Sequence, residues 1–399
     1  MHILLIHQSF AALNEPGGTR HYELARYLVA RGHRVTVIAS PVSYLTGDVA
    51  AQPEGDPLPG LTIRRAYTYT GFHRSFLHRI FSFLSFMVSS FWFGLRVPQV
   101  DLVWGSSPPI FQGVTALALA RWKGVPFLFE VRDLWPAFAV EVGVLRQPLL
   151  IRASEWLERF LYRHANRLVI NSPGFLAHVQ ARGARQVELV PNGADPDMFD
   201  PQEDGDDLRR EWGLEGRYVV LYAGAHGLSN DLGVALEAAR LLCDQPEIAL
   251  VFLGAGKEKQ ALIAQAQALD LDNVRFLPPL PKAEMSRALA AADACLAILK
   301  PVPLYATVYP NKVFDYMAAG KPVVLAIDGV IRQVVEDARA GMFVPPGDQA
   351  ALADAICRLA AHPEEGRAMG RRGRQYVEAH FDRAALAAQL EDILEAMVV

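Results

Sequence analysis

Two charged residues that could bind a ligand, Lys312 and Asp315, stand three residues apart in the stretch PNKVFDYMAAGKPVV at residues 310–324. Residues 313–319 have the composition of one or two helical turns, with Gly320 as the C-terminal stop. Helix N-termini attract anions, so we expect a phosphate to meet the backbone amides and Lys312. The carboxylate of Asp315 is suited to accept hydrogen bonds from sugar hydroxyls. The pair indicates a nucleotide-sugar site, with a surface ion pair as the alternative.

Two glycine-containing loops add to this pattern, YAGAHG at residues 222–227 and LGAGKEK at residues 253–259, each directly after an apolar strand segment. Their glycines permit close approach to a diphosphate. The lysine adds positive charge, and the histidine is suited either to donate to a phosphate or to cap its loop. Each motif is weak alone, but both lie at strand ends of one predicted domain. The residues concerned are Gly224, His226, Gly254, Gly256 and Lys257.

A third glycine loop, EPGGTR at residues 15–20, lies between the first predicted strand, residues 3–7, and the helix that follows it. Gly17 and Gly18 allow the backbone to come close to a ligand, and their amides lie near a helix N-terminus. The loop lacks the full G-x-G-x-x-G pattern of dinucleotide-binding proteins. A phosphate-binding loop and a flexible turn both fit.

Three charged residues crowd the end of a buried strand in FEVRDLWP, residues 129–136. Charges at such a position are costly unless they are paired or used. Strand alternation places Glu130 and Arg132 on one face, with Asp133 opposite or at the turn. Either carboxylate is a candidate general base, with Arg132 holding a phosphate. The alternative is an arginine–carboxylate brace.

Residues 73–96 form an unusually apolar and aromatic segment with basic ends. Its 16 uncharged residues at positions 80–95 span about 24 Å as a helix, less than the roughly 30 Å of a hydrocarbon core. Serines and arginines fall near one helical stripe, and apolar residues cover the rest. The pattern favours a helix lying in a membrane surface, and a helix buried in the protein is the alternative.

Short apolar strands alternate with helical segments along the whole chain, which predicts parallel α/β structure. The 399 residues suffice for two or three domains, and two successive α/β sheets fit better than one very large sheet. Ligands then bind in a crevice at the carboxyl ends of the strands. The net charge of −4 gives no case for nucleic-acid binding.

The expected domain boundaries follow from an Asp- and Pro-rich stretch near residue 200. The predicted parts are an N-terminal acceptor-binding Rossmann-like domain at 1–194, a linker at 195–207, a nucleotide-sugar-binding Rossmann-like domain at 208–381, and an amphipathic C-terminal helix at 382–399 that packs across the join. The first strand is too short for a signal-peptide core, which predicts a cytoplasmic protein.

These motifs together resemble the family 4 glycosyltransferases of the GT-B fold, in which two Rossmann-like domains face each other across a cleft. Within that family the chain is similar to the branch of L-fucosamine transferases of bacterial O-antigen and capsule synthesis. The matching stretches run nearly end to end, and their order and spacing carry the resemblance. They are HYELARYLVARGHRVTVI after the PGG loop, EVRDLWP, PNGAD, YAGAHG, NVRFLPPLPKAEMSRALAAADACLAIL, PNKVFDYMAAGKPVV and GMFVPPGD.

The resemblance implies a metal-independent hexosyltransferase that retains anomeric configuration and needs no cofactor. The implied donor is a UDP-sugar, most often an N-acetylated hexose, and the implied acceptor is a polyprenyl-diphosphate-linked saccharide. Such an acceptor agrees with peripheral attachment to the inner face of the cell membrane through residues 73–96. Asp315 takes the place of the second glutamate of the family's E-x7-E motif, and Asn311 lies beside it. Gly17 and Gly18 match the family's loop near the donor diphosphate.

Two departures bear on the donor site. The first glutamate of E-x7-E falls at Thr307, which has no carboxylate. The usual Arg and Lys after the first strand of the second domain are missing, and GAHGLSND stands there instead. Rival interpretations are a sugar-nucleotide epimerase of the same fold and a catalytically inactive nucleotide-binding scaffold. A hydride-transfer enzyme is disfavoured because no dinucleotide fingerprint is complete.

Overall fold

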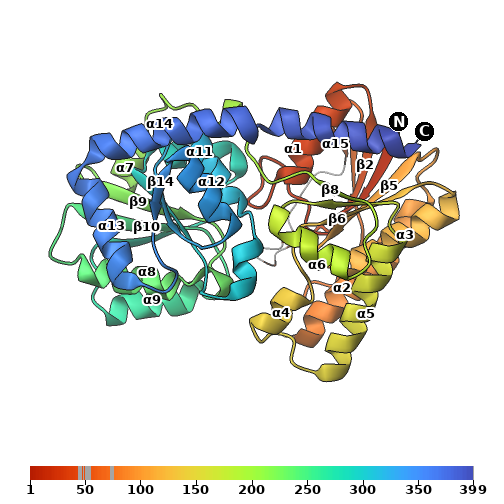
Figure 1. The fold of residues 1–399 in the computed structure, drawn as a ribbon, viewed down its shortest axis with the longest axis horizontal. Coiled ribbons are helices and arrows are strands. Elements are labelled where there is room, and N and C mark those ends of the chain that lie inside the picture. Colours follow the sequence, from red (N-terminus) through yellow and green to blue (C-terminus); the bar gives the residue numbers. More distant parts are fainter. Residues whose placement is uncertain (44–46, 48, 50–54, 72–75, 399) are drawn as a thin grey trace. The chain divides into compact units, whose positions relative to one another are not determined.

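A computed structural model of the chain describes residues 1–43, 47, 49, 55–71 and 76–398, and it divides into two compact units (Figure 1). Unit 1 comprises Met1–Ala12, Gly17–Pro191 and Ala384–Val399, and unit 2 comprises Leu13–Pro16 and Asn192–Arg383. Each unit is built on a sheet of parallel strands with helices on both faces. The prediction of two Rossmann-like α/β domains is therefore confirmed.

The described residues of unit 1 form an eight-stranded sheet in the order β3-β4-β2-β1-β5-β6-β7-β8, parallel except for the pair β3 and β4. All five residues of the central strand β1 are buried, as expected for a parallel sheet covered on both faces. Its strands are β1 (His2–Ile6), β2 (Arg34–Ala39), β3 (Gly55–Leu58), β4 (Leu61–Arg65), β5 (Leu102–Ser107), β6 (Phe127–Val131), β7 (Arg167–Ile170) and β8 (Val187–Leu189).

The helices of unit 1 cover this sheet in two layers. In Figure 1, α1 and α15 lie on one side of the strands, and α2, α3 and α5 lie on the other. The helices are α1 (Arg20–Ala30), α2 (Phe76–Leu95), α3 (Phe111–Lys123), α4 (Ala137–Glu141), α5 (Pro148–His164), α6 (Leu176–Ala181) and α15 (Arg383–Val398). The predicted segment 73–96 thus forms α2, although residues 73–75 lie outside the described part of the chain.

The described part of unit 2 contains a six-stranded, all-parallel sheet in the order β11-β10-β9-β12-β13-β14. Strand alternation divides its side chains between two cores: Val219 and Leu221 of β9 face one core, while Val220 and Tyr222 face the other. The strands are β9 (Tyr218–Ala223), β10 (Ile248–Leu253), β11 (Val274–Leu277), β12 (Ala294–Ile298), β13 (Val323–Ala326) and β14 (Gly341–Phe343).

Helices fill both cores of unit 2. The first core receives side chains from α10, α11, α12 and α14, and the second from α8, α9 and α13. The helices are α7 (Asp206–Trp212), α8 (Leu232–Leu241), α9 (Lys259–Ala268), α10 (Met285–Ala290), α11 (Asn311–Ala318), α12 (Val330–Ala338), α13 (Gln349–Ala361) and α14 (Pro363–His380).

The C-terminal helix α15 packs into unit 1. Its apolar side chains Leu386, Leu390 and Leu394 are buried in the same core as β1 and α1. Glu391 on the same helix accepts a hydrogen bond from the ring of His33 at 2.8 Å. The core of unit 1 therefore includes side chains of α15, which follows unit 2 in the sequence.

We expect Leu390→Ala to destabilise unit 1 by roughly 2–5 kcal/mol, because it leaves a cavity in a core that cannot fully collapse. Asp392→Ala, at an exposed position of the same helix, serves as the control and is expected to change stability by less than about 0.5 kcal/mol. Urea denaturation followed by tryptophan fluorescence measures both. Equal stability of the two variants would show that α15 does not contribute to the core.

Candidate active site

Helix α11 presents Lys312 and Asp315 at the carboxyl edge of the sheet of unit 2. The helix begins at Asn311, directly after Pro310, and ends at Ala318. Gly320 follows with φ of 67°, a left-handed conformation that suits glycine at a helix end. The apolar residues between the two polar ones are buried in the first core of unit 2. This burial fixes the rotation of the helix and thereby the direction of Lys312.

The Lys312 ammonium group is buried without a counter-ion in the described structure. Its Nζ lies 3.7 Å from the centroid of the Tyr222 ring, a cation–π contact, and has no hydrogen-bond partner among the described residues. The Tyr222 hydroxyl is held by a 2.7 Å bond that it donates to the carbonyl oxygen of Ala225. Lys312 is thus placed against an aromatic face with its donors unused.

Burial lowers the pKa of Lys312 from its ordinary 10.5 to about 7. The cause is loss of hydration, which disfavours the charged form. An anion bound beside Nζ would restore the charge and supply hydrogen-bond acceptors. A buried lysine with a perturbed pKa and unused donors is typical of a functional site.

His226 lies in the loop after β9, close to the same lysine. The ring is fully buried, and neither nitrogen has a hydrogen-bond partner in the described part of the chain. Burial, together with the charges of Lys259 and Lys312, lowers the pKa of His226 to about 4. The ring is therefore neutral at physiological pH and offers one donor and one acceptor.

The glycines of the two loops are needed first for packing of one loop on the other. A Cβ on Gly254 would lie 1.9 Å from the carbonyl oxygen of Gly224, and one on Gly256 would lie 2.4 Å from that of His226. The space on the Cβ side of these two glycines is filled by protein, and their contact with a diphosphate stays a prediction. Gly224 differs, because its missing Cβ leaves room for the Lys312 Nζ, 2.8 Å from the Cβ position.

Asp315 is tied into a polar network. One carboxylate oxygen pairs with the Nζ of Lys282 at 2.6 Å, and the other accepts a 3.2 Å bond from the side-chain amide of Asn311. The amide oxygen of Asn311 in turn accepts a 3.1 Å bond from Arg383. The sequence reasoning missed Lys282, although its position in PLPKAEM, just beyond β11, placed it at the same edge of the sheet.

Two further positions of the donor-site prediction differ in detail. Lys257 is exposed in the turn before α9, whereas Lys259 turns inward and donates to the carbonyl oxygens of Gly254 and Leu277 at 2.7 and 2.6 Å. Lys259, two residues after the predicted Lys257, is thus the lysine that contacts the loop at Gly254. Thr307 donates its hydroxyl to the carbonyl of Leu304 at 2.7 Å, a local contact within the turn.

In unit 1, Glu130 forms a buried brace. Its side chain is fully buried, and its two oxygens accept bonds from Arg20 at 2.9 Å and from His21 at 2.5 Å. Burial raises the pKa of Glu130, but its neighbours His21 and Arg20 outweigh this effect and hold it below the ordinary range. This geometry favours the brace over the general base, with Arg20 rather than Arg132 as the cation.

Arg132 and Asp133 follow directly after β6, where both are half-buried. The Nε of Arg132 donates to the hydroxyl of Ser106 at 2.8 Å. Burial raises the pKa of Asp133 to about 7, against the opposing effect of Arg132. Asp133 therefore exchanges a proton near neutral pH and remains the carboxylate of this edge that is suited to acid–base chemistry.

Gly17 and Gly18 are exposed in the loop that leads into α1. Gly17 has φ of 154°, and a Cβ there would lie 3.0 Å from Ala11, while no atom lies within 4 Å of the Cβ position of Gly18. The loop reaches the N-terminus of an 11-residue helix. Both glycines are exposed, and their contact with a diphosphate stays a prediction.

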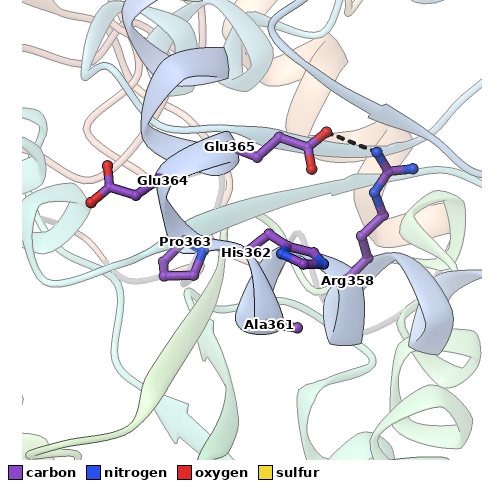
Figure 2. Close-up of a pocket in the computed structure, with 6 residues that line it drawn as sticks. All are labelled: Arg358, Ala361, His362, Pro363, Glu364 and Glu365. Atoms are coloured by element: carbon purple, nitrogen blue, oxygen red, sulfur yellow. Dashed lines mark hydrogen bonds and ion pairs between the residues drawn. The ribbon is translucent and has the colours of Figure 1, made fainter.

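A surface hollow of unit 2 lies at the junction of α13 and α14 and is lined by Arg358, His362 and Glu364, among others (Figure 2). Arg358 pairs there with Glu365 at 2.8 Å, and Glu364 points away from them (Figure 2). None of the candidate residues lines this hollow. It has the character of an ordinary solvated helix junction.

Helix α2 turns its polar stripe inward and part of its apolar surface outward. Ser89 donates to the carbonyl of Tyr67 at 2.6 Å, Ser85 accepts a bond from the amide of Tyr69 at 2.9 Å, and Ser82 is buried. Outward-facing Leu77, Phe81, Val88 and Trp92 are 55–64% exposed and share one face, being spaced by four, seven and four residues. Among the described helices, none is both long and apolar enough to cross a bilayer.

Comparison with known proteins identifies the class of protein. Residues 17–193 match the family described as glycosyl transferase 4-like domain, and residues 204–376 match glycosyl transferases group 1. Together the two profiles cover most of both units. The chain belongs to the GT-B glycosyltransferases, the class to which its fold and motifs point.

Among curated relatives, the D-inositol 3-phosphate glycosyltransferase of Nocardioides sp. is 34% identical over 269 residues, 62% of this chain and 57% of the relative. The GDP-mannose-dependent alpha-mannosyltransferase of Mycobacterium tuberculosis is 26% identical over 270 residues, 66% of each chain. The chain thus spans between half and two thirds of the length of these relatives.

Solved structures share the fold over the whole chain. The sucrose-phosphate synthase of Thermosynechococcus elongatus superposes with a TM-score of 0.78 at 20% identity, covering 99% of this chain and 98% of the other. HepE of Anabaena in complex with UDP-glucose gives 0.73 at 17% identity, covering 99% and 100%. These similarities establish the GT-B architecture.

The buried Lys312 predicts a specific dependence of stability on pH. Between its folded pKa of about 7 and its ordinary value of 10.5, the unfolded chain binds more protons than the native one, so native stability rises with pH across this window. Lys312→Met removes this group. We expect the variant to be more stable than the parent by roughly 2–5 kcal/mol at pH 6, since one pKa unit corresponds to about 1.4 kcal/mol.

The difference between Lys312→Met and the parent is expected to shrink as the pH rises towards 10. Urea denaturation at pH 6, 8 and 10 measures it. Lys257→Met, at an exposed position, is the control and should show no such trend. A Lys312→Met protein that is less stable than the parent at pH 6 would contradict the assignment of a buried, unpaired ammonium.

Proposed function

We propose that the protein is a retaining glycosyltransferase that moves a sugar, an N-acetylated hexose, from a UDP-sugar to a lipid-diphosphate-linked saccharide in bacterial surface-polysaccharide synthesis. The observation that carries the proposal is the buried ammonium of Lys312 beside Gly224, with its donors unused. A nucleoside diphosphate supplies the anion that this geometry lacks. HepE, a protein of the same fold, is known in complexes with UDP and with UDP-glucose.

In this reaction the bond between sugar C1 and the β-phosphate oxygen breaks, and negative charge grows on the departing UDP. Lys312 and the neutral ring of His226 are placed to donate to that charge, which they stabilise more in the transition state than in the ground state. The acceptor hydroxyl attacks C1 from the same face, and its proton passes to the departing phosphate oxygen. No protein nucleophile and no metal is required, so turnover is expected to survive EDTA.

Asp315 is proposed to bind the ribose hydroxyls of the donor. Its carboxylate is less than one-fifth exposed and already holds Lys282 and Asn311, so its orientation is fixed before the ligand arrives. The absence of a second carboxylate at Thr307 shifts more of the donor's binding onto the diphosphate.

On the acceptor side, we assign roles to Arg132 and Asp133. Arg132 is half-buried, and its guanidinium is held by Ser106, which makes it a candidate to contact the acceptor's diphosphate. Asp133, whose pKa burial raises to about 7, is assigned to orient the incoming hydroxyl by a hydrogen bond, while the proton of that hydroxyl passes to the departing phosphate oxygen. Glu130 holds Arg20 and His21 and acts as a positioning residue.

A lipid-linked acceptor implies contact with a membrane surface, and α2 is suited to it. The exposed stripe of Leu77, Phe81, Val88 and Trp92 is apolar, and Arg96 lies exposed just beyond the helix end. Apolar residues with basic neighbours partition to the interface of anionic bilayers. The inward-facing serines keep this stripe turned outward.

Lys312→Met tests the donor site directly. We expect the Kd for UDP, measured by isothermal titration calorimetry, to rise at least tenfold, because a charge-assisted contact to the diphosphate is lost. The matched control Lys257→Met removes an exposed lysine and should change the Kd by less than about threefold. Equal UDP affinity of Lys312→Met and the parent would refute the diphosphate assignment.

A panel of UDP-, GDP- and dTDP-sugars then identifies the donor by thermal shift, and the M. tuberculosis relative makes GDP-mannose a necessary member of it. UDP binding without transfer to any acceptor would indicate the inactive scaffold instead. Interconversion of the free UDP-sugar would indicate the epimerase.

The membrane assignment makes a separate prediction. Phe81→Ser together with Trp92→Ser is expected to reduce co-sedimentation with vesicles of phosphatidylglycerol and phosphatidylethanolamine at least fivefold, since most of the exposed apolar area is lost. Leu228→Ser with Leu241→Ser, at exposed positions of unit 2, is the control and should bind like the parent. Unchanged sedimentation of the α2 variant would rule out this helix as the docking element.

A further inference from the structure

Two imidazole rings lie tilted against each other at the carboxyl edge of the sheet of unit 1, and one of them, His7, has no role in the function proposed above. His7 is the first residue after β1, and His21 lies in the first turn of α1. Their ring centroids are 4.1 Å apart, and both side chains are buried. The sequence analysis assigned His7 to the end of the strand, whereas β1 stops one residue earlier.

His21 is anchored firmly. Its Nε2 bonds to Glu130 at 2.5 Å, and the other oxygen of Glu130 accepts from Arg20. The guanidinium of Arg20 also donates to the carbonyl oxygens of Val190 and Pro191, both at 2.7 Å. Three stretches that are far apart in the sequence, around residues 20, 130 and 190, thus fix one imidazole ring. Such a network holds a ring in one orientation against its neighbours.

His7 is the opposite case. It is 0% exposed, and among the described residues neither of its ring nitrogens has a hydrogen-bond partner. Its neighbours include the His21 ring and the edge of Phe10, whose centroid is 6.1 Å away. A buried polar ring without partners destabilises the fold relative to an apolar ring of similar shape. Its presence therefore calls for a partner outside the protein.

The surroundings of His7 define the chemistry of that partner. Burial lowers the pKa of His7, and His21 and Arg132 lower it further, so the ring is neutral. A neutral imidazole has one donor and one acceptor, which match a hydroxyl group that both accepts and donates. Arg132 is half-buried and follows β6 at the same edge of the sheet, so a ligand that reaches Arg132 comes close to His7.

We propose that His7 contacts a hydroxyl group of the sugar bound by unit 1, with His21 and Glu130 as positioning residues. The identity of the ligand as a sugar rests on the proposed function, while the claim that His7 serves a ligand rests on its burial and unused nitrogens. The His21 ring lies tilted against His7 and limits its rotation, and Glu130 holds His21 in place.

The experiment compares His7→Phe with His2→Phe. His2 is the first residue of β1 and His7 directly follows the strand; both are buried, but His2 bonds to the Gln99 carbonyl at 3.1 Å and to the Thr36 hydroxyl at 2.9 Å. We expect the urea midpoint to fall for His2→Phe and to stay level or rise for His7→Phe. A fall for His7→Phe as large as that for His2→Phe would make His7 structural and overturn the proposal.

Activity supplies the second readout, with a synthetic polyprenyl-diphosphate N-acetylglucosamine as acceptor probe and the donor chosen by the panel above. His7→Phe is expected to lower kcat/KM for the probe at least tenfold and to leave the Kd for UDP unchanged. His7→Asn, which keeps a donor and an acceptor, should recover part of the loss. This conservative variant also keeps the test valid if the phenylalanine is too large for the site.

Wild-type kcat/KM in His7→Phe would overturn the proposal. Failure of the proposed function looks different, because the parent protein itself then transfers no sugar. A stable His7→Phe protein in that case still supports a ligand at His7 and removes only its identification as a sugar.

Discussion

The contact of the buried Lys312 ammonium with the ring of Tyr222 is the interaction on which the candidate site of unit 2 depends. A positive charge inside a protein is strongly disfavoured without a counter-ion, yet here it rests on an aromatic face alone in the described structure. Three features make this possible: Tyr222 supplies the face, Gly224 leaves the space, and the buried side of α11 fixes the direction. Unit 2 therefore holds a cation without a counter-ion among the described residues, and the proposed function assigns the anion to the donor diphosphate.

Both units gather polar side chains at the carboxyl edge of a parallel sheet, but the side chains differ in charge. Parallel strands bring loop residues from distant parts of the sequence to one edge of a sheet, and in both units that edge holds buried polar groups with unused hydrogen-bonding capacity. In unit 2 these are a cation and a neutral histidine, which suit a charged diphosphate. In unit 1 His7 is neutral, which suits hydroxyls. This difference agrees with the proposed function, in which unit 2 binds the nucleotide sugar and unit 1 binds the saccharide acceptor.

The pattern of the sequence predicted the strands and the helix α11 well, because buried parallel strands are continuous apolar runs and Gly320 marks the end of the helix. Lys312 and Asp315 were predictable because a helix start places them at an edge of the sheet. The partners were not, since Lys282 and Arg20 reach their carboxylates across long sequence separations. The choice of Lys259 over Lys257 depends on the turn before α9, which residue composition does not specify.

The chain lacks both positive and negative charges of the family pattern, so the two losses partly cancel in net charge. The family's cations after β9 are absent, and so is its first glutamate, which is replaced by Thr307. Of the lysines on this edge, Lys282 is neutralised by Asp315, whereas Lys312 has no carboxylate beside it in the part that the structure describes. Under the proposed function, a carboxylate beside Lys312 would compete with the donor diphosphate, and Thr307 adds no negative charge of its own.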